Sequence, residues 1–310
     1  MNMISPGLPR VALIAGPTAS GKSALALALA EKHRGTVINA DSMQVYADLR
    51  ILTARPSAEE EARAPHRLFG HIDGAEACSA ARWAAEARAV IAEAHAEERL
   101  PILVGGTGLY LRTLIDGIAP IPEIDPAVRT EVRALPVAEA HAALALVDPG
   151  AAARLHAGDT LRVARALEVV RSTGRTLADW QDRREGGIGD TIQLAALILL
   201  PDRDWLGERI DRRFATMLAT AEDEVRALLA RTDLPADAPV LRAIGVHEIG
   251  KVLASEWSEE MALAAGATAT RQYAKRQYTW FRRQPPGGWE STAETDTYEN
   301  LRRIEMKLFP

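Results

Sequence analysis

Gly16-Pro17-Thr18-Ala19-Ser20-Gly21-Lys22-Ser23 matches the phosphate-binding pattern G-x-x-x-x-G-K-[ST] at every position, and this stretch decides the fold. The apolar run Val11–Ala15 before it predicts a buried strand, and the Ala- and Leu-rich segment Ser23–Lys32 after it predicts a helix. Backbone N–H groups at such a helix N-terminus bind phosphate oxygens, Lys22 adds a positive charge, and the Ser23 hydroxyl suits Mg²⁺. The motif therefore predicts a site for a polyphosphate and Mg²⁺, whichever molecule carries the phosphates.

Three more apolar runs continue the strand pattern: Thr36–Ala40, Pro101–Val104 and Ile192–Leu200. A helical segment, Ala80–Arg99, lies between the first two of these runs. Strands that alternate with helices along the chain predict a parallel sheet with right-handed crossovers. We therefore expect an α/β fold with a P-loop parallel sheet core flanked by helices.

Residues 119–190 contain no convincing strand and predict a helical insertion domain. Asp125-Pro126 and Asp148-Pro149 each combine an Asp N-cap with a proline at the first helical position. Leu161–Arg171 is helical, and Gly174 predicts its end. We expect this insertion to interrupt a catalytic core made of residues 1–118 and 191–310. After the last strand, the sequence predicts helices at Trp205–Arg231, Leu241–Leu253, Glu259–Arg283 and Thr295–Leu308.

The composition is that of an ordinary globular protein, with 47% hydrophobic and 25% charged residues. The single cysteine, Cys78, excludes a disulfide framework and a cysteine-cluster zinc site. No apolar stretch is long enough to cross a bilayer, and the N-terminal MNMISPGLPR lacks the apolar core of a signal peptide. We therefore expect a cytoplasmic protein without membrane association. Because the net charge is −5, a nucleic-acid surface requires a local concentration of basic residues.

Asp41 follows the second predicted strand, and Gly105-Gly106-Thr107-Gly108-Leu109-Tyr110 follows the third. Ligands of open α/β sheets bind at the carboxyl ends of the strands, so both segments should face the phosphate loop. Asp41 can hold Mg²⁺ through water, act as a general base, or cap the segment after it. The glycines, in place of a second acid, favour close approach of a ligand.

The segments GPTASGKS, DSMQVY and GGTGLY together resemble the tRNA dimethylallyltransferase (isopentenyltransferase) family. The resemblance continues in Asp159–Glu168, Thr173–Arg175, Arg242–Gly245, Arg271–Gln277 and Thr279–Arg282, so it extends from about residue 11 to 283. Two positions depart from the family pattern: Leu161 stands where Gln is usual, and Val246-His247 replaces an aromatic and a basic residue. The zinc finger of eukaryotic relatives is absent, which indicates the bacterial type.

The resemblance implies transfer of a dimethylallyl group from dimethylallyl diphosphate to N6 of the adenosine 3′ to the anticodon. The substrates would be tRNAs that read codons beginning with U, bound by the anticodon stem-loop, and pyrophosphate would be released. It implies that Asp41 is the base, that Lys22, Arg203 and Arg209 stabilise the pyrophosphate, that Gly16–Ser23 bind the diphosphate, and that Mg²⁺ lies on Ser23. The residues that it implies in tRNA contact are Asp41, Ser42, Met43, Gln44, Thr107, Arg129, Leu161, Arg162, Arg165 and Arg242. We expect a monomer.

The predicted C-terminal helix offers a second surface for tRNA. Its basic residues include Arg271, Lys275 and Arg276, and no acid lies among them. Tyr273 and Tyr278 lie between the basic positions, a pattern that suits phosphate contacts and base stacking. The same pattern also fits a helix with a buried aromatic side and a solvated charged side.

Two other functions remain open at this point. A small-molecule or nucleotide kinase would use the same loop and Mg²⁺, with Asp41 as base for a hydroxyl, but it leaves the basic and aromatic helix unexplained. A catalytically silent RNA-binding module would use the loop only to hold a backbone phosphate. ATP turnover with a small acceptor would favour the kinase, and tRNA binding without alkylation would favour the binding module.

Overall fold

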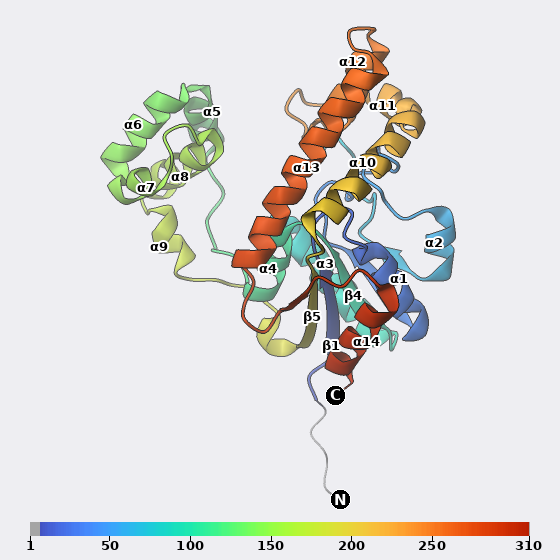
Figure 1. Cartoon of the computed structure of the whole chain (residues 1–310). Helices are drawn as coiled ribbons and strands as arrows, with labels where there is room; N and C mark the ends of the chain where they lie inside the picture. Colours follow the sequence, from blue (N-terminus) through green and yellow to red (C-terminus); the bar gives the residue numbers. More distant parts are fainter. Residues whose placement is uncertain (1–6, 310) are drawn as a thin grey trace, which may run out of the picture. The chain divides into compact units, whose positions relative to one another are not determined.

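Six parallel strands form one sheet in the order β3-β2-β4-β1-β5-β6 in the computed structural model, which describes residues 7–309 (Figure 1). Residues 1–6, from the N-terminal segment considered above, and residue 310 lie outside the described residues. The strands are β1 (Arg10–Ala15), β2 (Gly35–Asn39), β3 (His66–Arg67), β4 (Leu100–Gly105), β5 (Gln193–Leu199) and β6 (Glu290–Thr292).

The four strands predicted from apolar runs are confirmed, and so is the α/β fold class. They form the centre of the sheet, where β1 pairs with β4 (Ile14 opposite Val104) and with β5 (Leu13 opposite Ala196). The edge strands β3 and β6 were not predicted. They contain two and three residues and are largely polar, so they carry no hydrophobic pattern.

Helices α1 (Lys22–Lys32) and α14 (Thr297–Leu308) pack together against the central strands (Figure 1). Their buried side chains, such as Leu29 and Ile304, share one core cluster with Ile14 and Leu197 of the sheet. Helix α3 (Ala80–Ala96) packs against β2 and β4, and α2 (Ala58–Arg63) lies between β2 and β3 in the chain. This packing holds the first turn of α1, and with it the phosphate loop, against the sheet.

Two of the predicted C-terminal helices are wrong as single helices. The first is divided at Ala221 into α10 (Arg203–Thr220) and α11 (Glu222–Leu229), because three acids, Glu222 to Glu224, begin a new helix N-terminus. The second is a 3₁₀ turn (Pro239–Arg242) followed by α12 (Val246–Leu253). Gly245 lies between them with φ of 104°, a left-handed conformation that interrupts the helical backbone, and it is the N-cap of α12. Helix α13 (Glu259–Arg283) agrees with the prediction.

Residues Ile115–Ile188 form a compact unit of their own, and the rest of the described chain forms the other. The first boundary lies after Leu114, within α4 (Gly108–Asp116), and the second lies before Gly189. The sequence predicted an insertion at residues 119–190. The helices of this insertion unit are α5 (Pro126–Ala134), α6 (Val137–Val147), α7 (Pro149–Arg154), α8 (Thr160–Thr173) and α9 (Leu177–Gln181).

The insertion unit has its own buried core, which includes Val132, Leu144 and Leu167. Asp125 and Asp148 cap α5 and α7 as predicted, each with a proline at the start of its helix. Glu168 is only 1% exposed, and Arg133 Nε donates to its carboxylate at 2.9 Å. This pair neutralises a charge that would otherwise be buried alone.

We expect Gly105→Ala to lower the free energy of unfolding by about 1–3 kcal/mol, because the new methyl group overpacks a closed site. A Cβ at this position would overlap the backbone carbonyl group of Ala40, which directly follows β2 and is held by a hydrogen bond from its N–H to Val104. Urea unfolding measures the change. The control is Gly207→Ala in α10, where a Cβ meets nothing within 4 Å, and which should stabilise the protein by about 0.5–1 kcal/mol. Equal stability of Gly105→Ala and the parent would contradict this packing.

Candidate active site

Three loops meet at the carboxyl edge of the sheet, because β2, β4 and β1 are adjacent and parallel. β1 leads into the phosphate loop, Gly16–Ser23. β2 leads to Asp41, and β4 leads to Gly106 and Thr107. The sequence analysis expected these segments at one edge of the sheet.

Two glycines let the phosphate loop lie close to the sheet and turn into α1. A Cβ at Gly16 would lie 2.5 Å from the carbonyl oxygen of Leu199. Gly21 has φ of 93° and is the N-cap of α1. Residues Ala19–Ser23 then line a cavity of about 420 Å³, here called cavity 1. Ser23 is exposed at the first turn of α1.

Lys22 lies across the phosphate loop, and its Nζ donates a hydrogen bond to the Pro17 carbonyl oxygen at 3.1 Å. Desolvation lowers the pKa of Lys22 to about 8, the nearby Asp41 carboxylate raises it, and Arg213 lowers it further. A bound anion would favour the protonated form of such a lysine. With Arg209, Arg212 and Arg213 on its other side, cavity 1 is suited to an anion of high charge.

Helix α10 brings two arginines to the phosphate loop. Arg209 Nε donates to the Ala19 carbonyl oxygen at 3.1 Å, and Arg213 donates to Thr18 Oγ1. Burial lowers the pKa of Arg213, which, like Lys22, lies close to the Asp41 carboxylate. The sequence analysis missed Arg213, although its helical spacing from Arg209 places both on one side of the helix.

Arg203, which the sequence analysis grouped with Arg209, lies elsewhere. Its guanidinium lies over the Tyr278 ring, 5.0 Å from the ring centroid. Together with Arg271 and Lys275, it lines a third cavity between α10 and α13. It does not line either of the two cavities that lie next to the phosphate loop. The structure therefore separates Arg203 from Lys22 and Arg209.

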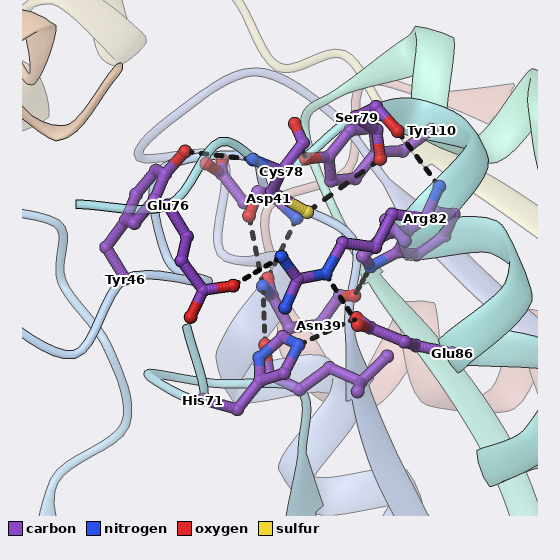
Figure 2. Close-up of polar contacts among 12 residues, drawn as sticks. Asn39, Asp41, Tyr46, His71, Glu76, Cys78, Ser79, Arg82, Glu86 and Tyr110 are labelled. Carbon is purple, nitrogen blue, oxygen red and sulfur yellow. Dashed lines mark hydrogen bonds and ion pairs between the residues drawn. The ribbon is translucent and has the colours of Figure 1, made fainter. Parts of the chain in front are cut away.

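Asp41 is positioned by the buried side chain of Asn39 (Figure 2). Asn39 Oδ1 accepts the Asp41 N–H at 2.8 Å, and Asn39 Nδ2 donates to the carbonyl oxygens of Asp41 and Leu68, both at 3.0 Å. Asp41 Oδ1 accepts the Met43 N–H at 3.0 Å, so Asp41 does cap the segment after it. Among residues 7–309, no hydrogen bond engages its other carboxylate oxygen.

A buried aromatic layer supports the end of β2 (Figure 2). Trp83 Nε1 donates to the Asn39 carbonyl oxygen at 2.8 Å, and the Trp83 ring stacks on Tyr110 with ring centroids 4.7 Å apart. The Tyr110 hydroxyl donates to the Cys78 carbonyl oxygen at 3.5 Å, and the Cys78 N–H donates to the Tyr46 hydroxyl at 3.4 Å. Burial raises the pKa of both tyrosines, so both phenols are neutral at physiological pH.

Gln277 of α13 connects two of the site loops. Its Oε1 accepts the Thr18 N–H at 2.8 Å, and its Nε2 donates to the Gly106 carbonyl oxygen at 3.0 Å. A Cβ at Gly106 would overlap Nε2 of Gln277, and a Cβ at Gly108 would overlap the Trp280 ring. The glycines after β4 therefore admit α13, rather than only a ligand as the sequence analysis inferred.

A second cavity of about 260 Å³, here called cavity 2, lies beside the phosphate loop. Thr18 and Arg213 line it, and Arg213 lines cavity 1 as well. Asp41 and Tyr273 contribute polar groups, and burial raises the pKa of the Tyr273 phenol. Apolar residues form another part of the lining: Met43, Leu52, Ile210, Phe214, Met217, Ala243 and Ile244. Asp41 thus lines the partly apolar cavity and lies close to Lys22 and Arg213, which line the anion site.

The residues expected to contact tRNA fall into several places. Those that line cavity 2 are Asp41, Ser42, Met43, Arg242 and Arg276. Thr107 is adjacent, because its Oγ1 accepts the Ser42 N–H at 3.0 Å. The Gln44 side chain instead donates to the carbonyl oxygens of Thr53 and Ala54 at 2.8 and 2.9 Å, which secures the chain after β2. Arg271 is paired with Asp211.

The expected tRNA contacts of the insertion unit lie around two cavities of that unit. Arg129, Leu161 and Arg165 line one cavity of about 460 Å³, and Arg162 and Arg165 line another of about 240 Å³. Leu161 is 76% exposed, so the residue that replaces the usual Gln is at the surface. Arg162 Nε lies 3.5 Å from the Asp159 carboxylate, and its side chain is 76% exposed.

The described residues contain no group of three or more His, Cys, Asp or Glu side chains arranged to hold a metal ion. Within residues 7–309, no helix has the length and apolar character needed to span a membrane. Ser20 and Ser23 are among the residues that line cavity 1, so hydroxyl oxygens are available there.

Comparisons with known proteins agree with this geometry. A family model described as IPP transferase matches residues 44–284. The chain is 63% identical to a tRNA dimethylallyltransferase of Sphingopyxis alaskensis, over 96% of this chain and 98% of that protein. It is 50% identical to the same enzyme of Zymomonas mobilis, over 98% and 97% of the two chains.

Solved structures give the same result. The tRNA isopentenylpyrophosphate transferase of Bacillus halodurans has a TM-score of 0.67 at 34% identity and covers 96% of both chains. A eukaryotic dimethylallyltransferase acting on tRNA has a TM-score of 0.76 at 30% identity, over 88% of this chain and 70% of that one. The chain therefore belongs to the IPP transferase family, whose curated members compared here are tRNA dimethylallyltransferases.

Proposed function

We propose that this protein transfers the dimethylallyl group of dimethylallyl diphosphate to N6 of the adenosine 3′ to the anticodon in tRNAs that read codons beginning with U. The observation that carries the proposal is that Asp41 lines the partly apolar cavity 2 and lies close to Lys22 and Arg213, which line cationic cavity 1. A diphosphate suits the first cavity, and a hydrocarbon chain beside a purine suits the second. A kinase needs the cations but has no use for an apolar wall next to Arg213.

The chemistry requires a strongly activated donor, because the lone pair of the adenine amine is delocalised into the ring. In the reaction, the bond between the allylic carbon and the diphosphate oxygen breaks, and its electron pair leaves with pyrophosphate. The amine nitrogen forms a bond to the allylic carbon and loses one proton, which the Asp41 carboxylate accepts.

The residues around cavity 1 would stabilise the departing pyrophosphate. Lys22 and Arg213 supply positive charge. Arg209 also lines the cavity, and its hydrogen bond to the Ala19 carbonyl oxygen holds the loop backbone. The N–H groups of Ala19, Gly21, Lys22 and Ser23 would donate to the diphosphate, whereas that of Thr18 is bound to Gln277 and that of Ser20 to the Pro17 carbonyl oxygen. Mg²⁺ fits a site with the Ser23 hydroxyl and few other protein donors, because this ion usually keeps waters and binds substrate phosphates. When bound, it would neutralise charge on the diphosphate.

The tRNA would be bound by cationic side chains of both units, with the target base out of its stack. In the core unit, Arg242 and Arg276 line cavity 2, and Arg271 and Lys275 line the third cavity. In the insertion unit, Arg129, Arg162 and Arg165 would contact the backbone of the anticodon stem-loop. We propose that the protein acts as a monomer in the cytoplasm.

The direct test is incubation with labelled dimethylallyl diphosphate, Mg²⁺ and unmodified tRNA, followed by nucleoside analysis. We expect N6-dimethylallyladenosine and pyrophosphate, with no need for ATP. Asp41→Asn keeps the size of the side chain but removes the base, so turnover should fall roughly 10²–10⁴-fold while tRNA binding changes little. Turnover within a few-fold of the parent would leave Asp41 only the capping role seen at Met43. ATP hydrolysis with a small acceptor would favour a kinase instead.

Binding of inorganic pyrophosphate should weaken as the pH rises through about 8, where Lys22 loses its proton in the free protein. The bound anion raises the pKa of this lysine, so binding above that pH takes up a proton. Calorimetry in two buffers with different heats of ionisation measures the uptake. Lys22→Met should abolish this part of the uptake, whereas Lys32→Met, on the last turn of α1 and paired with Glu305, should retain it. The same uptake in the Lys22 variant and the parent would refute the assignment.

Arg162→Ala should reduce the salt dependence of tRNA binding, because log affinity changes with log salt by roughly 0.9 for each duplex phosphate contact. The matched control is Arg302→Ala on α14. Arg302 is 74% exposed and paired with Glu299 three residues before it, much as the 76% exposed Arg162 is paired with Asp159. An unchanged slope for Arg162→Ala would contradict a phosphate contact. We exclude Arg165 from this test, because its guanidinium lies 3.9 Å from the buried Glu168 and its loss would also affect stability.

A further inference from the structure

Cavity 2 is lined by polar and by apolar side chains. The polar residues Asp41, Arg242 and Arg276 are each at least partly exposed. The apolar residues Ile210, Phe214 and Met217 of α10 are 2%, 3% and 8% exposed. Because a base has polar edges and an allylic chain has none, the buried apolar residues suit the chain and the polar residues suit the base.

One helix lines both the anion site and the apolar wall. Arg209 and Arg213 of α10 line cavity 1, and Ile210, Phe214 and Met217 line cavity 2. Within each set the residues are three or four positions apart, and Ile210 and Phe214 each follow an arginine directly. The two sets therefore occupy adjacent stripes along α10. A donor whose diphosphate lies at Arg213 would therefore extend its hydrocarbon chain along the stripe that carries Phe214.

The Phe214 ring is held in place by a glycine on the facing helix. A Cβ at Gly266 of α13 would overlap three carbon atoms of the Phe214 ring. Gly266 lies in the interior of α13, where glycine costs helix stability relative to alanine. The Phe214 ring therefore packs against the backbone of Gly266 and cannot move further toward α13. It forms a rigid end to the cavity.

We propose that Phe214, seated against Gly266, limits the allylic donor to five carbons; this inference rests on the proposed function. Cavity 2 measures about 260 Å³, roughly the volume of nine molecules of liquid water. That is room for a short branched chain and part of a purine, and a second five-carbon unit would meet the ring of Phe214. Removing the ring frees a volume similar to that of the extra unit.

The first experiment compares dimethylallyl diphosphate with the ten-carbon geranyl diphosphate, using unmodified tRNA and the ratio of the two kcat/KM values. Phe214→Ala should shift this ratio toward the ten-carbon donor by roughly tenfold or more, as expected when a hydrophobic pocket gains length. The control is Phe281→Ala. Phe281 is also 3% exposed, but it belongs to α13 and does not line the cavity, so its loss should leave the ratio unchanged.

The second experiment makes the cavity smaller. Gly266→Ala should push the Phe214 ring into cavity 2 and lower kcat/KM for dimethylallyl diphosphate, and the additional change Phe214→Leu should restore it. Gly207→Ala, in open space on α10, serves as the control for a helical glycine. If Phe214→Ala does not fold, the Gly266→Ala variant and the Gly266→Ala, Phe214→Leu double variant still test the role of Phe214.

The outcomes separate this inference from the proposed function. A parent protein that alkylates tRNA with neither donor contradicts the proposed function. A parent that uses both donors equally, or a folded Phe214→Ala variant with the parent's ratio, overturns the role of Phe214. Failure of Phe214→Leu to restore activity in the Gly266→Ala background does the same.

Discussion

The side-chain amide of Gln277 is the interaction on which the arrangement of the site depends. It bridges the Thr18 N–H of the phosphate loop and the Gly106 carbonyl oxygen after β4, and it is only 5% exposed. Because both backbone groups would otherwise lack a partner in a buried place, loss of the amide would cost more than one ordinary hydrogen bond. Through this bridge, a helix near the C-terminus sets the positions of two loops from the N-terminal third of the chain.

The charges of the site are arranged around a single carboxylate. Lys22 and Arg213 are both desolvated, which lowers the pKa of each, and both lie close to Asp41. An anion bound in cavity 1 would compensate the desolvated cations and so complete the charge balance of the site. In the proposed chemistry, the bound diphosphate favours the charged forms of these cations. The cations then stabilise the pyrophosphate as it leaves.

The insertion unit has its own capped helices and its own core. Its helices begin at Asp-Pro pairs and enclose their own apolar core. Glu168 is buried within this unit against Arg133, so this arginine neutralises an internal charge. The exposed Arg162 is held only by a surface ion pair, which contributes little to stability. Arg133 thus serves the stability of this unit, whereas Arg162 keeps its charge at the surface.

Local signals in the sequence determined the central strands, the phosphate loop, the Asp-Pro helix starts and helix α13, because each depends on residues close together in the chain. The motif around Gly16–Ser23 also identified Lys22 and Ser23, and the end of the second strand identified Asp41. The tertiary structure alone decided what lies opposite them. Arg213 and Phe214 were read from the sequence as ordinary helix residues, and the contact of Gly266 with Phe214 joins α13 to α10. Strands β3 and β6 form by backbone pairing with β2 and β5, respectively. Such features depend on how distant segments pack, and packing leaves no periodic pattern in the sequence.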